Sequence, residues 1–311
     1  KFFKAAHPDR FFDCGIAEGN MIGVAAGLAA AGKPVFASSF AMFAAGRAFE
    51  QIRNSVAYPH LNVKIAATHA GITVGEDGAT HQCLEDIALM RVLPGMTVIS
   101  PADAVEAVAA LKAALEMTGP CYLRFGRYAV PVLHDPDTYR FEIGKGEVLR
   151  DGSDVTIVAN GILVSMALTA ADTLAAEGIS ARVINIHTVK PLDTELLCAA
   201  AAETGAVVTA EEHNIIGGLG SAVAETLAEN CPVPMVRVGV RDSFGRSGKV
   251  PELLALYGGF FFLGIFLGIV FLAVTVMIIF YKQISEGYDD RERYIIMEKV
   301  GMSHAEVKAT I

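Results

Sequence analysis

The sequence has no tryptophan and no excess of positive charge. Its 311 residues include 25 lysines and arginines against 34 aspartates and glutamates, so the formal net charge is −9. No basic patch or stripe is present, which excludes the nucleic-acid-binding classes that depend on one. The N-terminus also lacks a secretory signal peptide. Because the sequence begins at Lys1 rather than methionine, we interpret it as a fragment.

Paired cysteine motifs are missing as well. The cysteines are scattered without a CxxC motif or any other paired spacing, at Cys14, Cys83, Cys121, Cys198 and Cys231. This distribution argues against a disulfide framework and against a zinc site. We therefore expect reduced thiols and a cytoplasmic location.

Short apolar runs alternate with helical patterns along most of the chain, and this pattern indicates parallel sheets flanked by helices. The first predicted strand is Phe11–Cys14, followed by a helix rich in small residues over Gly19–Ala31. The next predicted helix covers Ala41–Tyr58. Several prolines and glycines between residues 128 and 154 are typical of a linker with a small hairpin. We expect an α/β fold with two mostly parallel sheets, in domains over residues 1–135 and 136–258.

The most informative stretch is the polar loop over Thr68–Gln82, which follows an apolar run that is typical of a buried strand. Its glycines allow tight turns and a close approach to a ligand. Loops at the carboxyl ends of strands bind ligands in open α/β sheets. The loop carries His69, Asp77 and His81, and histidine is the usual group for proton transfer near neutral pH. We predict that these three side chains share one cavity.

The order T-H-x-x-I-x-x-G-E-D-G-x-T-H-Q in this loop resembles the substrate loop of transketolases. The segment Cys14–Met21 is similar to the family segment that carries the glutamate for thiamine diphosphate. The segment Ser38–Phe43 is similar to the aromatic wall around that cofactor. The resemblance extends from about Pro8 to about Gly258. It implies a truncated pyrimidine-binding domain followed by a transketolase C-terminal domain.

The resemblance implies roles for three residues around the cofactor. Glu18 would hydrogen-bond N1′ of the aminopyrimidine ring and so help the C2 proton of the thiazolium to leave. Phe40 and Phe43 would stack beside the pyrimidine. Without the resemblance, Glu18 would be interpreted as a charge at a helix N-terminus and the phenylalanines as ordinary core residues.

The family pattern also implies substrate contacts. His69 and His81 would transfer protons, and Asp77 would bind sugar hydroxyls, because an ionised carboxylate accepts strong hydrogen bonds. Arg127 occupies the position that binds the substrate phosphate, for which a guanidinium is well suited. Arg124 is the rival candidate, and its alternative role is a salt bridge at a strand end.

The motif for the cofactor's diphosphate and its Mg²⁺ is absent from the sequence. Some transketolases are divided into two chains, and this sequence resembles the C-terminal one. The resemblance therefore implies that an N-terminal subunit supplies most of the Mg²⁺ site. It also implies a homodimer or a heterotetramer, and sugar-phosphate substrates. An earlier strand–helix–strand unit, with a further phosphate-binding arginine, would lie before Lys1.

Two other motifs leave alternatives open. The glycine cluster within Glu211–Ser221 could be taken for a nucleotide loop, but we interpret it as a helix start and an interface turn. Deoxyxylulose-phosphate synthases share the G-x-D-G-x-T-H-Q core. That family usually lacks a histidine at the position of His69, so the sequence favours transketolase.

The C-terminal segment has a different character. Residues 259–281 contain no charged residue and are long enough to span a membrane, with Tyr257 and Tyr281 near the ends. We predict one transmembrane helix there. The tail over residues 282–311 is amphipathic and resembles a cytoplasmic segment of FtsX-like ABC-transporter permeases.

Two families joined without a linker at about Gly258 suggest a composite gene, or alternatively a true fusion. If the junction is genuine, the chain would be anchored in a membrane through residues 259–281. A contrasting function is then an FtsX-like permease fragment with a soluble passenger. Such a passenger would not need Glu18, His69, Asp77 and His81 together.

Overall fold

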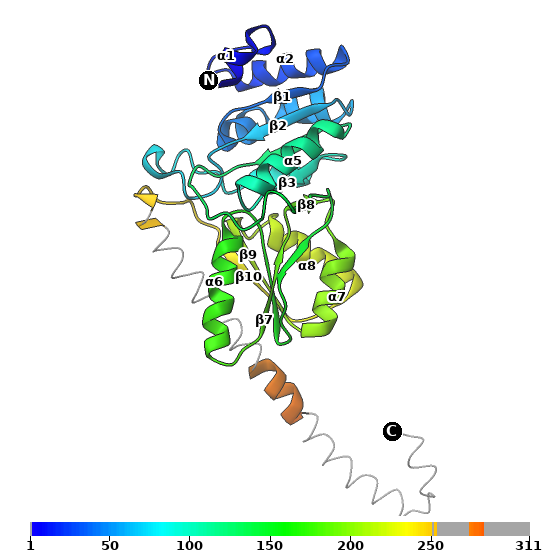
Figure 1. The fold of residues 1–311 in the computed structure, drawn as a ribbon, viewed down its shortest axis with the longest axis vertical. Coiled ribbons are helices and arrows are strands. Elements are labelled where there is room, and N and C mark those ends of the chain that lie inside the picture. Colours follow the sequence, from blue (N-terminus) through cyan, green and yellow to red (C-terminus); the bar gives the residue numbers. More distant parts are fainter. Residues whose placement is uncertain (1, 251, 254–273, 283–311) are drawn as a thin grey trace, which may run out of the picture. The chain divides into compact units, whose positions relative to one another are not determined.

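The structure is a computed structural model, and it describes residues 2–250, 252–253 and 274–282. The chain divides into two compact units, Lys1–Ile265 and Phe266–Ile311. Both sheets lie in the first unit, and the short helices α1 (Phe2–Ala6) and η1 (Pro8–Arg10) precede them (Figure 1).

The first sheet has the order β1-β2-β4-β3-β8. The first four strands are parallel to their neighbours, and β8 is antiparallel to β3. All three residues of β3 and all four of β4 are buried, which is typical of parallel strands covered by helices, whereas Phe36 in the edge strand β1 is exposed. The bounds are β1 (Val35–Ala37), β2 (Val63–Ala67), β3 (Thr97–Ile99), β4 (Cys121–Arg124) and β8 (Thr188–Lys190).

Three α-helices and a long irregular helical segment accompany this sheet. The α-helices are α2 (Glu18–Ala30), α4 (Asp86–Arg91) and α5 (Ala104–Glu116). Asp103 caps α5, because its carboxylate accepts a hydrogen bond of 2.8 Å from the backbone nitrogen of Glu106. Buried alanines in α2 let it approach the sheet closely.

The second sheet has the order β10-β9-β6-β7-β5, with β5 antiparallel at one edge and the other strands parallel. Figure 1 shows α6 on one side of this sheet and α7 and α8 on the other. The strands are β5 (Glu147–Arg150), β6 (Val155–Ala159), β7 (Ala181–Asn185), β9 (Val207–Asn214) and β10 (Met235–Val240). The helices are α6 (Leu163–Ala176), α7 (Thr194–Thr204) and α8 (Leu219–Asn230). The predicted α/β class with two mostly parallel, helix-flanked sheets is therefore confirmed.

Several local predictions were wrong. Residues 11–14 form no strand, because no neighbouring strand in the described chain hydrogen-bonds to them. The helix predicted over Ala41–Tyr58 is instead two wide π-helical turns, η2 (Met42–Arg47) and η3 (Ile52–Ala57), around the short α3 (Phe49–Gln51). Strand β8 was not predicted; it follows β7 in the second half of the chain but completes the first sheet.

The expectation that all cysteines are reduced was also wrong. Cys198 in α7 and Cys231 at the end of α8 form a disulfide, with their Cα atoms 5.7 Å apart. These helices lie side by side, although the two cysteines are 33 positions apart in sequence. Sequence spacing does not show this proximity. Cys14, Cys83 and Cys121 are free thiols, as expected.

Most of the predicted membrane segment and all but the first residue of the permease-like tail lie outside the described residues. Residues 274–282 are helical. Within the described part of the chain, no helix has both the length and the apolarity needed to cross a membrane. The transmembrane helix over residues 259–281 and the FtsX-like tail stay predictions.

Candidate active site

The candidate site lies where three neighbouring parallel strands end. Ser39 and Phe40 follow β1, His69 follows β2, and Arg127 follows β4, and these strands are adjacent in the sheet. Backbone hydrogen bonds continue past the strand ends, from Ala41 N to Thr68 O at 2.6 Å and from Thr68 N to Ser39 O at 3.0 Å. The carboxyl edge of the sheet therefore brings together side chains from separate parts of the chain.

Glu18 begins α2 and is almost fully buried. Arg47 Nη1 donates to one carboxylate oxygen at 2.7 Å, and Ser39 Oγ donates to the other at 3.1 Å. Burial raises the pKa of Glu18, but hydrogen bonds from its own backbone, Arg47 and Ser39 together outweigh burial and hold the pKa below its usual value. Glu18 is therefore a preorganised, ionised carboxylate. Arg47 was not predicted from the sequence.

Phe40 and Phe43 form one aromatic surface together with both histidines of the loop. The Phe40 ring stacks on His69 with centroids 3.8 Å apart, and the Phe43 ring meets the edge of His81 at 5.3 Å. The two phenylalanine rings lie nearly parallel at 6.2 Å. The Arg47 guanidinium lies 4.6 Å from the Phe43 centroid, so this arginine links the aromatic surface to Glu18.

The loop places Asp77 between His69 and Arg127. Asp77 Oδ2 lies 3.1 Å from Arg127 Nη1 and 4.0 Å from His69 Nε2. Burial lowers the pKa of His69; Asp77 opposes this effect, whereas Arg127 and His81 reinforce it. His69 is therefore neutral at neutral pH and can accept a proton. Its backbone φ of +60° is uncommon for a residue with a side chain.

The two candidate arginines have different surroundings. The side chain of Arg127 is 40% exposed and reaches the loop, where its guanidinium also donates to the Val74 carbonyl. The side chain of Arg124 is only 5% exposed and lies 2.9 Å from Asp86 Oδ2. Arg124 also donates to the Glu212 carbonyl at 2.9 Å. Arg124 is thus an internal ion-pair residue, and Arg127 is the arginine that can meet an anion.

A residue of the second sheet fixes the loop. Glu212 in β9 accepts hydrogen bonds of 2.8 Å from the backbone nitrogens of Ile72 and Thr73. Gly71 has a φ of +83°, and a Cβ atom on it would lie 2.2 Å from Glu212 Cδ. Glycine is therefore required at position 71 for backbone conformation and for space. This role of Glu212 was not predicted, because the residues that it contacts lie about 140 positions away and no local pattern relates them.

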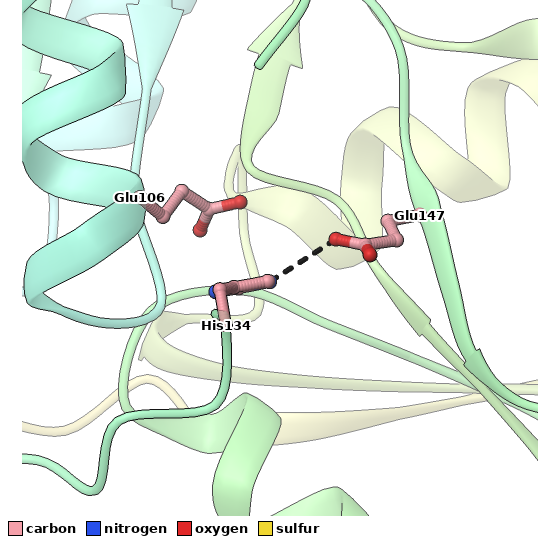
Figure 2. Close-up of side chains that lie close together, drawn as sticks. All are labelled: Glu106, His134 and Glu147. Carbon is pink, nitrogen blue, oxygen red and sulfur yellow. Dashed lines mark hydrogen bonds and ion pairs between the residues drawn. The ribbon is translucent and has the colours of Figure 1, made fainter. Parts of the chain in front are cut away.

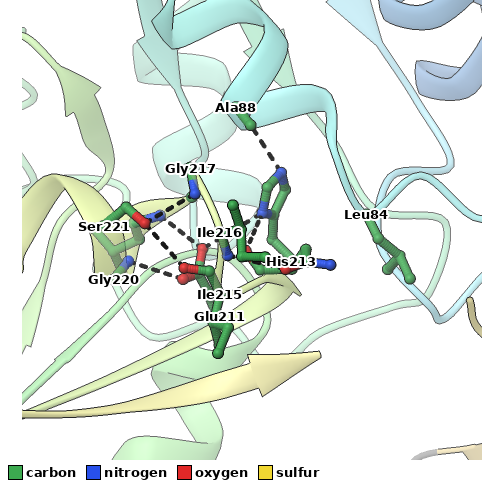
Figure 3. A network of polar contacts seen from close by, with 12 residues as sticks. Leu84, Ala88, Glu211, His213, Ile215, Ile216, Gly217, Gly220 and Ser221 are labelled. Atoms are coloured by element: carbon green, nitrogen blue, oxygen red, sulfur yellow. Dashed lines mark hydrogen bonds and ion pairs between the residues drawn. The ribbon is translucent and has the colours of Figure 1, made fainter. Parts of the chain in front are cut away.

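The neighbouring residues Glu211 and His213 organise the glycine cluster (Figure 3). Glu211 accepts hydrogen bonds from the backbone nitrogens of Leu219 at 2.6 Å and Gly220 at 2.8 Å, at the start of α8. His213 Nδ1 donates to the Asn214 carbonyl at 2.6 Å, and Nε2 accepts from the Ala88 nitrogen at 3.4 Å. Since Ala88 belongs to α4 of the first sheet, the predicted helix start and interface turn are confirmed.

The chemistry of the site fits the pyrimidine end of thiamine diphosphate. A buried carboxylate, Glu18, is connected through Arg47 to a pair of parallel aromatic rings. A cluster of donors for a metal ion is not part of this arrangement. In the described residues, the one group of side chains close enough to hold a metal is Glu106, His134 and Glu147, none of which belongs to the site.

Comparison with known proteins agrees with this architecture. The sequence model for the transketolase pyrimidine-binding domain matches residues 1–132, and the model for the transketolase C-terminal domain matches residues 144–259. The first match contains β1 to β4, and the second contains the whole second sheet together with β8, which completes the first sheet.

Individual relatives cover most of the described chain. A Methanocaldococcus jannaschii protein named as a transketolase C-terminal section is 53% identical over 258 residues, which cover 82% of this chain and 81% of the relative. A solved structure described as a split gene transketolase, inactive beta4 tetramer, is 55% identical with a TM-score of 0.81, and the match covers 87% of this chain and 88% of that one. A 1-deoxy-D-xylulose-5-phosphate synthase from Heliobacterium modesticaldum is 44% identical over 82% of this chain, but over only 40% of its own length.

Proposed function

Because this chain belongs to the transketolase family, we propose that it is the C-terminal subunit of a split transketolase. It would transfer a two-carbon ketol unit between sugar phosphates. Deoxyxylulose-phosphate synthase is the weaker alternative, because that relative is less similar and much longer than the matched region.

One observation supports this proposal: the predicted residues, together with Arg47, form a continuous series of contacts. Glu18 contacts Arg47, and Arg47 lies over Phe43, which meets His81. On the other side, Phe40 stacks on His69, which faces Asp77, and Asp77 pairs with Arg127. A carboxylate, an aromatic surface, two imidazoles and a guanidinium are the groups that the reaction needs.

Thiamine diphosphate, when bound, supplies the carbon nucleophile and the electron sink with which a carbon–carbon bond beside a ketone can break and form. Glu18 would hold a proton at N1′ of the aminopyrimidine. Phe40 and Phe43 would hold that ring and exclude water from it. Arg47 keeps Glu18 ionised before the cofactor binds, since it donates to the carboxylate at 2.7 Å.

The loop would bind the sugar. His69 is neutral and can take a proton from a substrate hydroxyl as the carbon–carbon bond breaks. His81 contacts the same aromatic surface and would also transfer protons to or from the substrate. Asp77 would accept hydrogen bonds from sugar hydroxyls. Arg127 would bind the phosphate, and its half-exposed side chain is free to turn from Asp77 toward an anion.

The proposal requires a partner. We propose that an N-terminal subunit binds the diphosphate and Mg²⁺, and that the two subunits form a heterotetramer or a larger symmetric assembly. The solved split-gene relative that is described as an inactive beta4 tetramer supports a need for a second kind of subunit.

The experiment is reconstitution. The purified chain, with thiamine diphosphate and Mg²⁺, is assayed for ketol transfer alone and after mixing with an N-terminal subunit of a split transketolase. We expect activity only in the mixture. Turnover by the chain alone would show that no N-terminal subunit is needed and would overturn that part of the proposal. An inactive but assembled complex would argue against the transketolase assignment.

A further inference from the structure

A second polar cluster lies apart from the candidate active site, and none of the roles above uses it. It consists of Glu106 in the first turn of α5, His134 in the connection between the sheets, and Glu147 at the start of β5 (Figure 2). One donor atom from each of the three residues lies within 4.8 Å of the other two. We propose that these three side chains bind a Zn²⁺ ion.

The imidazole of His134 is already oriented for a metal. Its Nδ1 lies 3.0 Å from Asp103 Oδ2, and its Nε2 lies 3.1 Å from Glu147 Oε2. The Asp103 carboxylate is fully buried and also accepts hydrogen bonds from the backbone nitrogens of Leu133 and His134. A carboxylate that holds one ring nitrogen while the other faces the ligand site is the usual outer shell of a zinc-binding histidine.

Glu106 is similarly fixed. One oxygen accepts from Tyr139 Oη at 2.5 Å and Asn185 Nδ2 at 2.9 Å, and the other accepts from the Ala102 backbone nitrogen at 2.5 Å. A carboxylate has about four acceptor positions, so after these three hydrogen bonds about one lone pair, on the oxygen that accepts from Ala102, remains for a metal. The side chain is fully buried, so it would need no ordering when the ion binds.

The cluster has access to solvent and room for a further ligand. A cavity of about 430 Å³ borders it, and its lining includes His134, Tyr139, Glu147 and His187. Three protein ligands with an open position for water form a common zinc arrangement, with Zn–N and Zn–O distances of about 2.0–2.2 Å. Small side-chain movements could bring the donors to such distances.

The donor set favours zinc over harder cations. Mg²⁺ and Ca²⁺ prefer oxygen ligands alone, whereas imidazole with carboxylates suits Zn²⁺. Two carboxylates would balance the charge of the ion. Binding would replace the proton shared by His134 Nε2 and Glu147 Oε2, and this proton would leave to solvent. The scattered cysteines, which gave no sign of a zinc site, take no part.

The ligands come from both halves of the chain, since α5 accompanies the first sheet and β5 is the edge strand of the second. Zn²⁺ would therefore link the two sheets at a point distinct from the Glu212 contact. The competing interpretation is that His134 is an imidazolium that serves only as an ion-pair partner for the surrounding carboxylates. A binding experiment separates the two interpretations.

The test is titration of the full chain, freed of metal by a chelator and without thiamine diphosphate, with ZnCl₂ in a calorimeter. A parallel titration with Co²⁺ is followed by visible absorption. We expect one equivalent to bind, and Co²⁺ to give a spectrum without the intense near-ultraviolet band of thiolate ligands. His134→Gln and Glu147→Gln should each weaken binding at least about tenfold, since even outer-shell partners of metal ligands typically contribute about 10–100-fold.

Glu142→Gln is the matched control, because Glu142 is an exposed carboxylate in the same connection. It should leave binding unchanged. If His134→Gln does not fold, Glu147→Gln still tests the proposal. Glu147 is partly exposed at a sheet edge, so replacing its carboxylate leaves the core intact. Absence of saturable binding, or binding that is equally strong in both ligand variants, would overturn the proposal.

Discussion

The Glu212 carboxylate lies 2.8 Å from the backbone nitrogen of Ile72, although the two residues are 140 positions apart in the chain. This contact ties the loop over Thr68–Gln82 in one domain to a buried strand of the other. A loop without such an anchor would have to be ordered by the substrate itself, and binding would then become weaker by the free energy of that ordering.

The first prediction tests this anchor. Glu212→Ala leaves the Ile72 and Thr73 amides buried without an acceptor, at a cost of about 1–3 kcal/mol for each. We expect the free energy of unfolding to fall by roughly 3 kcal/mol in denaturant titrations, on the same grounds. Hydrogen exchange at these two amides should become faster. Glu212→Gln keeps one oxygen acceptor, so its free energy of unfolding should fall much less. Equal decreases in both variants would show that the charge of Glu212, rather than its capacity to accept hydrogen bonds, stabilises the loop.

Gly71 and Glu212 should also be energetically coupled. Gly71→Ala places a Cβ atom against the Glu212 carboxylate and strains a positive φ, so it should destabilise the chain. In the double variant with Glu212→Ala, the clash is absent while the backbone strain remains. The sum of the losses in unfolding free energy of the two single variants should therefore exceed the loss in the double variant. Strict additivity in a double-mutant cycle would contradict the observed packing.

A third prediction concerns Glu18. In the reconstituted complex, Glu18→Ala should reduce turnover by about 10²–10⁴-fold, the usual contribution of a positioned acid or base. The fold should persist, because the Arg47 partner is half exposed and water can solvate it. Circular dichroism checks the fold. Glu50→Gln is the control, since Glu50 bonds only exposed neighbours, and a near-normal rate for Glu18→Ala would refute the proposed role.

A fourth prediction separates substrate classes. Arg127→Ala should raise KM for phosphorylated sugars far more than for unphosphorylated ones, because we propose that its guanidinium binds the substrate phosphate. Arg127→Lys should raise KM for phosphorylated sugars less than Arg127→Ala does, since lysine keeps the positive charge but not the planar guanidinium. Steady-state kinetics with a phosphorylated and an unphosphorylated ketol donor measure this difference in KM. Equal changes in KM for both classes would mean that Arg127 mainly positions Asp77, its partner at 3.1 Å.

Acid stability gives a fifth prediction. Burial, opposed by the nearby Asp86 and reinforced by Arg124, lowers the pKa of His213 to about 4. An unfolded histidine has a pKa of about 6.5, so between about pH 6.5 and 4 only the unfolded state takes up this proton. Folding stability is therefore lost as the pH falls through this window, by about 3 kcal/mol at most from this residue.

His213→Asn keeps a donor for the Asn214 carbonyl but cannot titrate. Its free energy of unfolding, measured between pH 7 and pH 4, should fall less steeply than that of the parent chain. His7→Asn, which replaces an exposed histidine outside this network, is the matched control. A parent-like slope for His213→Asn would mean that other groups control acid unfolding.

Features that depend on neighbours within a short stretch were predictable. The loop over Thr68–Gln82 follows a buried strand as expected, and its two histidines and Asp77 do gather at one edge of the sheet. The helix predicted from Gly19 begins at Glu18. Periodicity and glycine spacing are local properties, and parallel-sheet topology then places the strand ends together.

Features that depend on distant partners were not predictable. Arg47 pairs with Glu18, and Glu212 holds the Ile72 amide, only because separate elements fold against one another. Cys198 and Cys231 meet because two helices lie side by side. Residues 11–14 have the composition of a strand but lack a partner in the described chain, and a strand is defined by pairing rather than by composition.

The antiparallel pairing of β8 with β3 has a consequence for synthesis on the ribosome. The edge of the first sheet stays uncovered until Lys190 has emerged, long after Arg124, the last residue of β4, has been made. An open sheet edge invites pairing with other chains. Truncation between the two domains, for instance after residue 135, should therefore yield a product that aggregates, whereas a nascent chain extended beyond residue 190 can close its own edge.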